Sequence, residues 1–297
     1  MKILFTGANG FLGKNVIPLL RKKFFDVKTF GTHDADYIYN IADEIPMFKE
    51  KFEIIFHAAG KAHSIPQNKD EEKKFFDINF EGTKNLCRSL EKNVPNIFIF
   101  ISTVAVYGKD FGERIHEDFP LEGSTPYAKS KILAENFLQE WCNAHHVKLF
   151  VFRPSLIAGP NPPGNLGDMI NAIKKNKYFN IAGGKAKKSI FWVEDFAELT
   201  FLALKNKGGI YNVCDDMNPD FNEISRKISC LLHKKNPKSI PFVIAKGLAI
   251  CGDLIGKSAP INSLKLKKIT SNLTFSNVKV KHDLGFSASN VMEKFKI

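Results

Sequence analysis

The sequence predicts an α/β fold, a doubly wound parallel sheet followed by a small C-terminal lobe. Three observations support this. Short apolar runs alternate with helical patterns through the first half of the chain, and such βα units build parallel sheets covered by helices. The run Ile97–Ile101 is apolar at successive positions, as expected for a strand buried on both faces. The alternation stops after Arg153, where a proline-rich connection begins.

The elements of the first half follow from the spacing of apolar residues. Helices are predicted where apolar residues recur close to every 3.6 positions, as they do in the segment after Gly10. The expected helices are Gly10–Lys23, Glu71–Lys92 and Tyr127–His145. The expected strands are Lys2–Phe5, Val27–Phe30, Ile54–Ala58, Ile97–Ser102 and Lys148–Arg153.

The composition is that of a folded globular protein, with 44% hydrophobic and 25% charged residues. The formal net charge of +12 fits either a lysine-rich composition or attraction of polyanionic ligands such as dinucleotides and nucleotide sugars. Because the lysines are scattered and no nucleic-acid-binding motif is present, a nucleic acid partner is not expected. Five cysteines without a C-x-x-C pair predict neither a disulfide framework nor a metal site, and favour the cytoplasm.

The sequence contains no signal-peptide pattern and no span long enough to cross a membrane. The most apolar late stretch, Ile240 to Ile255, is interrupted by Lys246 and Asp253 and is too short to span a bilayer. A buried helix is the favoured interpretation, and a helix lying on a membrane surface is the alternative.

The turn after the first strand carries glycines at three-residue spacing, at Gly7, Gly10 and Gly13. In a strand–turn–helix context the first glycine permits a tight turn, the second lets backbone approach a pyrophosphate, and the third allows close packing. The following helix offers free N–H groups to the anion. The pattern therefore predicts a dinucleotide site.

The motif Thr6-Gly-x-x-Gly-Phe-Leu-Gly resembles the extended short-chain dehydrogenases/reductases of the NAD-dependent epimerase/dehydratase family, which process nucleotide sugars. The resemblance extends to Asp283–Phe286 near the C-terminus. It implies a Rossmann-type dinucleotide-binding domain over residues 1–154 and a substrate lobe mainly over 155–297, with segments such as 189–214 returning to the first domain. It also implies a homodimer, with a contact that involves the helix predicted over Tyr127–His145.

The same resemblance implies the cofactor contacts. They are Gly7, Asn9, Gly10, Phe11, Leu12, Gly13, Asn40, Ile41, Ala58, Ala59, Gly60, Ser102, Tyr127, Lys131 and Pro154. NAD-preferring relatives carry an acid at the end of the second strand, whereas this chain reads Phe30-Gly-Thr-His-Asp34. The cofactor is therefore expected to be NADP or NAD, with a slight preference for NADP. His57 is interpreted as a packed residue and not as a base.

Tyr127-x-x-x-Lys131 places a phenol and an ammonium on one face of a helix. A nearby cation favours the phenolate, so this tyrosine can exchange a proton with a sugar oxygen. Thr103 stands 24 residues before Tyr127, at a strand end, and the resemblance implies that its hydroxyl contacts the reacting oxygen, with Ser102 as the alternative. Asn79 is expected to support this trio.

On the substrate side, the resemblance implies that Asn165 and Lys188 contact a sugar-linked diphosphate, with Lys185 and Lys187 as alternatives to Lys188. Dehydratases of this kind carry an acid pair directly after the strand-end threonine, where this chain has Val104 and Ala105. The expected activity is reduction of a C4 keto nucleotide sugar. The alternatives are C4 epimerisation of a nucleotide sugar and, less favoured, a non-catalytic dinucleotide sensor.

Overall fold

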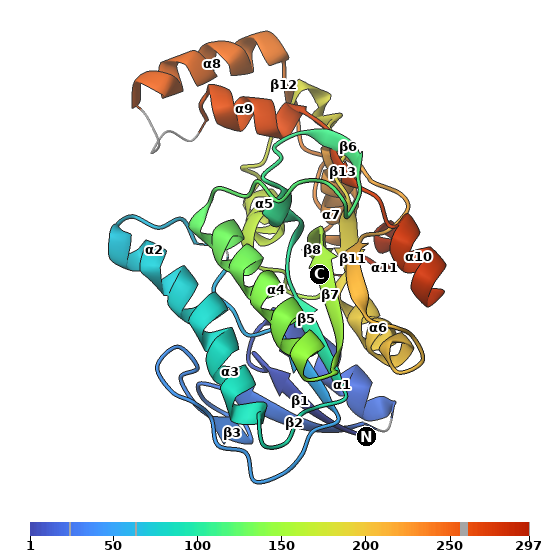
Figure 1. Ribbon diagram of the computed structural model, residues 1–297. Helices are drawn as coiled ribbons and strands as arrows, with labels where there is room; N and C mark the ends of the chain where they lie inside the picture. Colours follow the sequence, from blue (N-terminus) through green and yellow to red (C-terminus); the bar gives the residue numbers. More distant parts are fainter. Residues whose placement is uncertain (24, 63, 256–260, 297) are drawn as a thin grey trace.

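The computed structural model describes residues 1–23, 25–62, 64–255 and 261–296. Its centre is a seven-stranded sheet in the order β11-β7-β5-β4-β1-β2-β3 (Figure 1), and every neighbouring pair is parallel. The strands are β1 Lys2–Thr6, β2 Asp26–Gly31, β3 Tyr37–Ile38, β4 Ile54–His57, β5 Ile97–Ile101, β7 Lys148–Pro154 and β11 Gly209–Val213. The predicted doubly wound parallel sheet is confirmed, and all five predicted strands belong to it.

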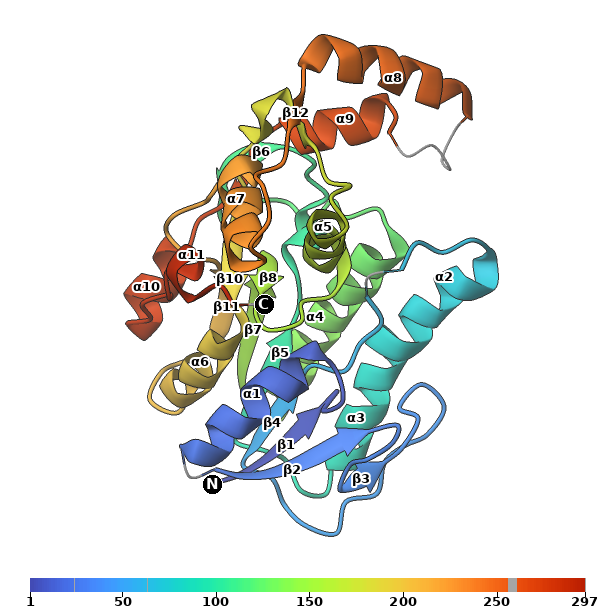
Figure 2. The same cartoon turned by 180° about the vertical axis from the view of Figure 1, so that it is seen from behind.

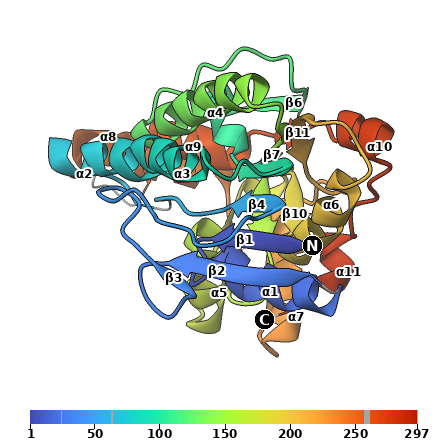
Figure 3. The same ribbon diagram turned by 60° about the horizontal axis from the view of Figure 1, so that its bottom comes forward.

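Helices cover both faces of the sheet (Figure 3). One face packs on α1 Phe11–Lys22 and α6 Phe196–Ala203, and the other on α3 Gly82–Leu90 and α4 Pro126–Ala144. Alternate residues of a strand enter opposite cores because successive side chains of a strand point to opposite faces. In β5, Ile97, Ile99 and Ile101 enter the first core, whereas Phe98 and Phe100 enter the second.

The helix predicted over Glu71–Lys92 is not one regular α-helix. It comprises α2 Lys69–Phe76, a π-helical segment Asp77–Glu81 and α3. A π segment inserts one residue into the helical turn, and such insertions are frequent at functional sites. The insertion lies at Asn79, which is buried.

The second half of the chain adds a lobe above the carboxyl ends of the strands (Figures 1 and 2). Its helices are α5 Gly164–Lys174, α7 Phe221–Leu231, α8 Phe242–Ile255, α9 Ser263–Thr270 and α11 Val291–Lys294. The helix α10 Val278–Leu284 packs instead against β11 and the first core of the central sheet. Three short parallel pairs join the lobe, namely β8 Leu156–Ala158 with β10 Ile190–Trp192, β9 Asn180–Ile181 with β12 Ser239–Ile240, and β6 Gly112–Ile115 with β13 Leu273–Phe275. Between these segments the chain returns to the central sheet through α6 and β11.

The interpretation of Ile240–Ile255 as a buried helix is wrong. The helix α8 forms as expected, but it packs only through Ala245, Ala249 and Gly252, while most of its large apolar side chains are exposed. Apolar composition predicts a helix that avoids water, yet here three small residues suffice to hold it against α9. Within the described residues, no helix is both long and apolar enough to cross a membrane.

The close packing of α1 on the glycine turn generates a stability prediction. A Cβ added at Gly13 would lie 2.1 Å from the Ala8 carbonyl oxygen. Because this neighbour is backbone, we expect Gly13→Ala to cost about 1–3 kcal/mol and to lower Tm by roughly 2–10 °C in a thermal unfolding scan. The matched control is Gly247→Ala in α8, where an added Cβ meets nothing within 4 Å. That change should leave Tm equal or higher, and equal Tm values for both variants would contradict the packing argument.

Candidate active site

A cavity of about 520 Å³ lies where the carboxyl ends of β1, β4, β5 and β7 meet the start of α5. In open α/β sheets, ligands bind in the crevice at this edge. The lining residues are Gly7, Gly10, Phe11, Leu12, Ala58, Gly60, Lys61, Ala62, Ile101, Ser102, Thr103, Tyr127, Lys131, Pro154, Ser155, Leu156, Ile157, Pro163 and Asn165. We call this the strand-end cavity.

The glycine turn forms one wall of the strand-end cavity. Gly7 adopts a positive φ of +75°, and a Cβ there would lie 2.8 Å from the Ala59 nitrogen, so only glycine lets the turn rest against the loop after β4. Gly10 stands at the N-cap of α1, where no side chain caps the helix. The first N–H groups of α1 therefore lack a side-chain partner at a position that suits a pyrophosphate.

Thr103, Tyr127 and Lys131 come together as predicted from the sequence. Thr103 follows β5 and accepts a hydrogen bond from the Ala105 nitrogen at 3.1 Å. Tyr127 lies in the first turn of α4, which begins with Pro126 and is capped by Thr125, and its phenol is hydrogen-bonded to Thr103. One turn later, the Lys131 ammonium donates to the Ile101 carbonyl at 2.9 Å.

Burial shifts the pKa values of both ionisable members of the trio. It raises the pKa of Tyr127 to about 12, an effect that the hydrogen bond to Thr103 partly opposes. It lowers the pKa of Lys131 to about 8, which Glu135 partly opposes. At neutral pH the phenol therefore holds its proton, and the ammonium is close to titrating.

Asn79 connects the loop after β4 to the helix that carries the trio. Its Oδ1 accepts from the Lys61 nitrogen at 2.7 Å, and its Nδ2 donates to Ser130 Oγ at 2.9 Å. Ser130 Oγ in turn donates to the Tyr127 carbonyl at 2.8 Å. The π-helical insertion thus places an amide that orients both the loop and the first turn of α4.

A buried ion pair lies behind the trio. Arg153 Nη2 donates to Glu135 Oε2 at 2.6 Å, with both side chains almost fully buried. Ser102 also donates to Glu135, and Arg153 Nη1 donates to the Tyr107 hydroxyl at 3.0 Å. This network joins α4 to the ends of β5 and β7.

His57 is a packed neutral residue, as expected. Its two ring nitrogens are hydrogen-bonded to Thr6 and Thr83 at 2.7 and 2.9 Å. Burial, and then the charge of Lys131, lower the pKa of His57 to about 3. An imidazole that stays neutral inside the core does not serve as a catalytic base at neutral pH.

Ser155 shows that the cavity can accept a polar ligand. The residue lines the cavity, and its buried hydroxyl has no hydrogen-bond partner. An unsatisfied buried hydroxyl is costly unless a ligand supplies the partner. Together with the glycine turn and the Lys131 ammonium, this hydroxyl fits a nicotinamide dinucleotide lying across the strand ends.

Ten residues of the cofactor set expected from the sequence line the cavity. They are Gly7, Gly10, Phe11, Leu12, Ala58, Gly60, Ser102, Tyr127, Lys131 and Pro154. Five others are not among its lining residues: Asn9, Gly13, Asn40, Ile41 and Ala59. The amide of Asn40 hydrogen-bonds Asp43 within its own turn, so its assignment to the cofactor stays a prediction.

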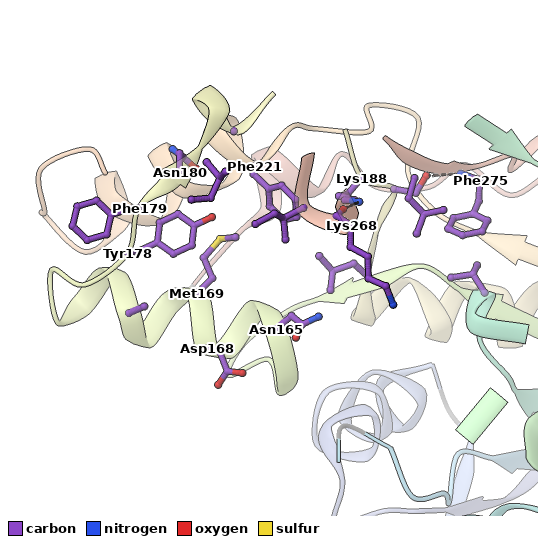
Figure 4. Close-up of a pocket in the computed structure, with 18 residues that line it drawn as sticks. Asn165, Asp168, Met169, Tyr178, Phe179, Asn180, Lys188, Phe221, Lys268 and Phe275 are labelled. Carbon is purple, nitrogen blue, oxygen red and sulfur yellow. Dashed lines mark hydrogen bonds between the residues drawn. The ribbon is translucent and has the colours of Figure 1, made fainter. Parts of the chain in front are cut away.

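A second cavity, of about 610 Å³, adjoins the first inside the lobe and shares Asn165 and Leu156 with it. We call it the lobe cavity. Figure 4 shows aromatic side chains at both of its ends, Tyr178 and Phe179 at one and Phe275 at the other, with Lys188 and Lys268 between them. Lys185 and Lys187 are exposed and do not line it.

Lys188 reaches the lobe cavity while holding the end of α9. Its ammonium donates to the Lys268 and Ser271 carbonyls at 3.0 and 2.9 Å, and burial lowers the pKa of Lys188 to about 8. The ammonium of Lys268 pairs with Asp110 at 2.8 Å. The contact of Lys188 with a diphosphate therefore stays a prediction, and Lys268 is a second cation at the same cavity.

Sequence reasoning missed several polar residues that line the two cavities, including Lys61, Ser155 and Lys268. Lys61 follows Gly60 directly, so the glycine loop itself was a usable signal for it. Ser155 follows the predicted Pro154 in the same way. Lys268 had no such signal, because it lies in a lysine-rich helix distant in sequence from the other lining residues.

Comparison with known proteins now defines the family. Residues 3–214 match the model of the NAD dependent epimerase/dehydratase family. Because this match covers more than two thirds of the chain, the protein belongs to that family. The recognised resemblance is thereby confirmed.

Two relatives and one solved structure resemble the chain over almost its whole length. The chain is 27% identical to the N-acetyl-alpha-D-glucosaminyl-diphospho-ditrans,octacis-undecaprenol 4-epimerase of Escherichia coli O157:H7, over 96% of this chain and 90% of that protein. It is 23% identical to the UDP-glucose 4-epimerase of Vibrio cholerae, over 98% and 92%. Its fold matches UDP-glucuronic acid 4-epimerase from Bacillus cereus in complex with UDP-glucuronic acid and NAD, with a TM-score of 0.75, 17% identity and coverage of 99% and 96%.

The buried ion pair predicts a large stability effect. In Arg153→Met, the Glu135 carboxylate is left buried without its partner, which should cost about 3–5 kcal/mol in a urea unfolding curve. The double variant Glu135→Leu, Arg153→Met removes both charges and should recover most of that loss. A loss below about 1 kcal/mol in the single variant would contradict the role of the pair.

The pKa of Lys131 predicts a pH effect on cofactor binding. Because its ammonium loses its proton as pH rises through about 8, dinucleotide affinity should fall between about pH 7 and pH 9, by up to roughly tenfold. Isothermal titration of the dinucleotide at the two pH values measures this. Lys131→Met should bind weakly with little pH dependence, whereas Lys129→Met, an exposed change on the same helix, should behave as the wild type. A pH effect that survives in Lys131→Met would assign the titration to another group.

Proposed function

We propose that the protein is a C4 epimerase of sugars carried on a diphosphate. The observation that carries the proposal is the Thr103–Tyr127–Lys131 trio in the strand-end cavity, which shares Leu156 and Asn165 with the lobe cavity. A sugar held beside the trio has its reacting hydroxyl near the phenol, while the rest of the substrate extends past these shared residues into the lobe. The trio by itself serves oxidation or reduction equally well. Two 4-epimerases among the relatives, which match over almost the whole chain, favour the epimerase.

The residues of the strand-end cavity fit a dinucleotide of the NAD type. When bound, its nicotinamide supplies a hydride acceptor and donor. In its ionised form, Tyr127 accepts the proton of the C4 hydroxyl as the sugar is oxidised, and it returns that proton after reduction on the opposite face. Lys131 lowers the cost of the phenolate, because a positive charge nearby favours the ionised phenol. Thr103 holds the reacting oxygen by a hydrogen bond.

Water elimination is not part of this proposal. Val104 and Ala105 follow Thr103 in the short helical turn after β5, where an eliminating enzyme needs a proton donor and a proton acceptor. Neither an isopropyl nor a methyl group transfers protons. This supports epimerisation within a family whose name covers both activities.

The diphosphate is assigned to the junction of the two cavities. Asn165 lines both, and Lys188 and Lys268 line the lobe cavity. The rest of the lobe cavity is lined mostly by apolar residues. It accommodates the carrier attached to the diphosphate, which is either a nucleoside or a polyisoprenol. The relatives include both carriers by name, undecaprenol and UDP, so both belong in the test.

Reduction of a 4-keto sugar is the second candidate, and the end of β2 favours it. There Gly31 is followed by Thr32 and His33, so no carboxylate directly after the strand repels a 2′-phosphate. An NADP-type cofactor would exchange between turnovers and suit a reductase. The end of β2 thus favours the reductase, whereas the two 4-epimerases among the relatives favour the epimerase.

Product analysis separates the candidates. Purified protein is incubated with NAD and, in separate reactions, UDP-N-acetylglucosamine and polyisoprenyl-diphospho-N-acetylglucosamine, and the C4 epimers are resolved by chromatography. We expect interconversion of one pair without net NADH formation. Tyr127→Phe should lose about 10²–10⁴-fold in rate, and Lys129→Met should not. Oxidation of NADPH by a 4-keto sugar, with no epimer formed in either reaction, would establish the reductase instead.

A further inference from the structure

The helix α8 presents an unusual surface at the end of the molecule remote from the central sheet. Figures 1 and 2 show it as the outermost element, with α9 between it and the rest of the lobe. Its inward face consists of Ala245, Ala249 and Gly252, spaced four and three residues apart and packed near Leu266 of α9. The large apolar side chains of α8 are exposed, namely Phe242, Val243, Ile244, Leu248, Ile250, Leu254 and Ile255. We call these seven residues the α8 apolar face.

The surroundings of the α8 apolar face are strongly basic. Between positions 231 and 270 the sequence contains eight lysines and a single acid, Asp253. The Asp253 carboxylate is exposed but accepts hydrogen bonds from the nitrogen and hydroxyl of Ser263. Exposed lysines lie before α8, on it and on α9, at Lys234, Lys235, Lys238, Lys246 and Lys267.

The apolar face and the lysines around it together indicate the kind of partner that α8 binds. A contiguous apolar surface of this size marks an interaction site, and the flanking cations require that the partner be anionic. A second copy of the chain fits poorly, because a symmetric contact through α8 would bring two basic surfaces together. The homodimer expected from the family resemblance uses α4, which is a separate surface. An anionic lipid bilayer satisfies both requirements, since apolar side chains enter the interface and lysines bind the headgroups.

We infer that α8 docks the protein on the surface of an anionic membrane. With 14 residues, the helix is about 21 Å long, so it lies on a bilayer and does not cross it. The docked orientation also places the lobe cavity close to the lipid, because Lys268 and Ile269 of α9 line that cavity directly beneath α8. The inference concerns binding alone and holds whichever sugar is the substrate.

Co-sedimentation of the full-length protein with vesicles tests the inference. We expect pelleting with phosphatidylcholine vesicles that contain phosphatidylglycerol, less with phosphatidylcholine alone, and less at high salt. Val243→Gln, Leu254→Gln changes two side chains that are 79% and 90% exposed, so folding should be unaffected, and vesicle affinity should fall at least about tenfold. The matched control is Ile38→Gln, Met47→Gln, which changes two exposed apolar residues, one in β3 and one lining the same surface cavity. Since β3 lies at the end of the molecule opposite α8 (Figure 1), this control should bind as wild type.

A fluorescent label gives a second readout without changing the apolar face. Cys230 and Cys251 are the exposed cysteines among the five, and Cys251 lies in α8. An environment-sensitive label on Cys251 in a Cys230→Ser variant should shift to the blue on adding anionic vesicles. The same label on Cys230, in Cys251→Ser, should not. Dinucleotide binding by each variant confirms folding, and this check does not depend on the proposed epimerase activity.

Several outcomes would overturn the inference. In the first, the wild-type protein stays in the supernatant with anionic vesicles. In the second, the Val243→Gln, Leu254→Gln variant binds these vesicles as strongly as the wild type. In the third, the emission of the label on Cys251 does not change when anionic vesicles are added. Dimers that dissociate in that variant, in the absence of vesicle binding, would identify the α8 apolar face as a contact between copies of this chain.

Discussion

The buried pair of Glu135 and Arg153 is the interaction on which the site depends. Removing two charges from water is expensive, and the cost is offset only when each charge finds a complete set of partners. Here Ser102 and Arg153 bind the carboxylate, and the guanidinium also reaches the Tyr107 hydroxyl. Because Glu135 lies one turn beyond Lys131 on α4, the pair sets the position of that helix against the strand ends. The negative charge of Glu135 also keeps the pKa of Lys131 from falling further.

Local patterns allowed the central sheet and the trio to be predicted from sequence. Continuous apolar strands indicate burial on both faces, and Tyr127 and Lys131 share a helical face through their spacing alone. The π-helical segment at Asn79 could not be predicted in this way, since one inserted residue barely disturbs the apolar periodicity of the helix. Its effect lies in a tertiary contact, the amide bridge to Lys61 and Ser130.

The lobe was less predictable because its contacts are not local. Lys188 and Lys268 face one cavity although 80 residues separate them, and the bond from the Lys188 ammonium to the Lys268 carbonyl joins them. Composition predicted α8 as a helix but not its exposure, because exposure depends on whether any other segment covers it. The small residues Ala245, Ala249 and Gly252 permit close approach of α9, and no large apolar side chain of α8 lies among the buried residues of the apolar cluster at this contact. Fold class, therefore, follows from periodicity, whereas the shape of the substrate side follows from packing between distant segments.

The late return of β11 to the central sheet has a consequence for folding. This strand pairs with β7 only after the chain has passed through the segments between residues 155 and 208. Until then β7 is an unprotected edge, and unpaired edges of apolar strands promote aggregation. Asn212 on β11 also accepts the hydrogen bond of the Tyr107 hydroxyl at 2.7 Å, so the last strand of the central sheet in chain order completes the polar network behind the trio. During synthesis, the nascent chain must therefore emerge beyond residue 213 before the helix that carries Tyr127 and Lys131 acquires its final support, and formation of long-range parallel pairs of this kind is slow.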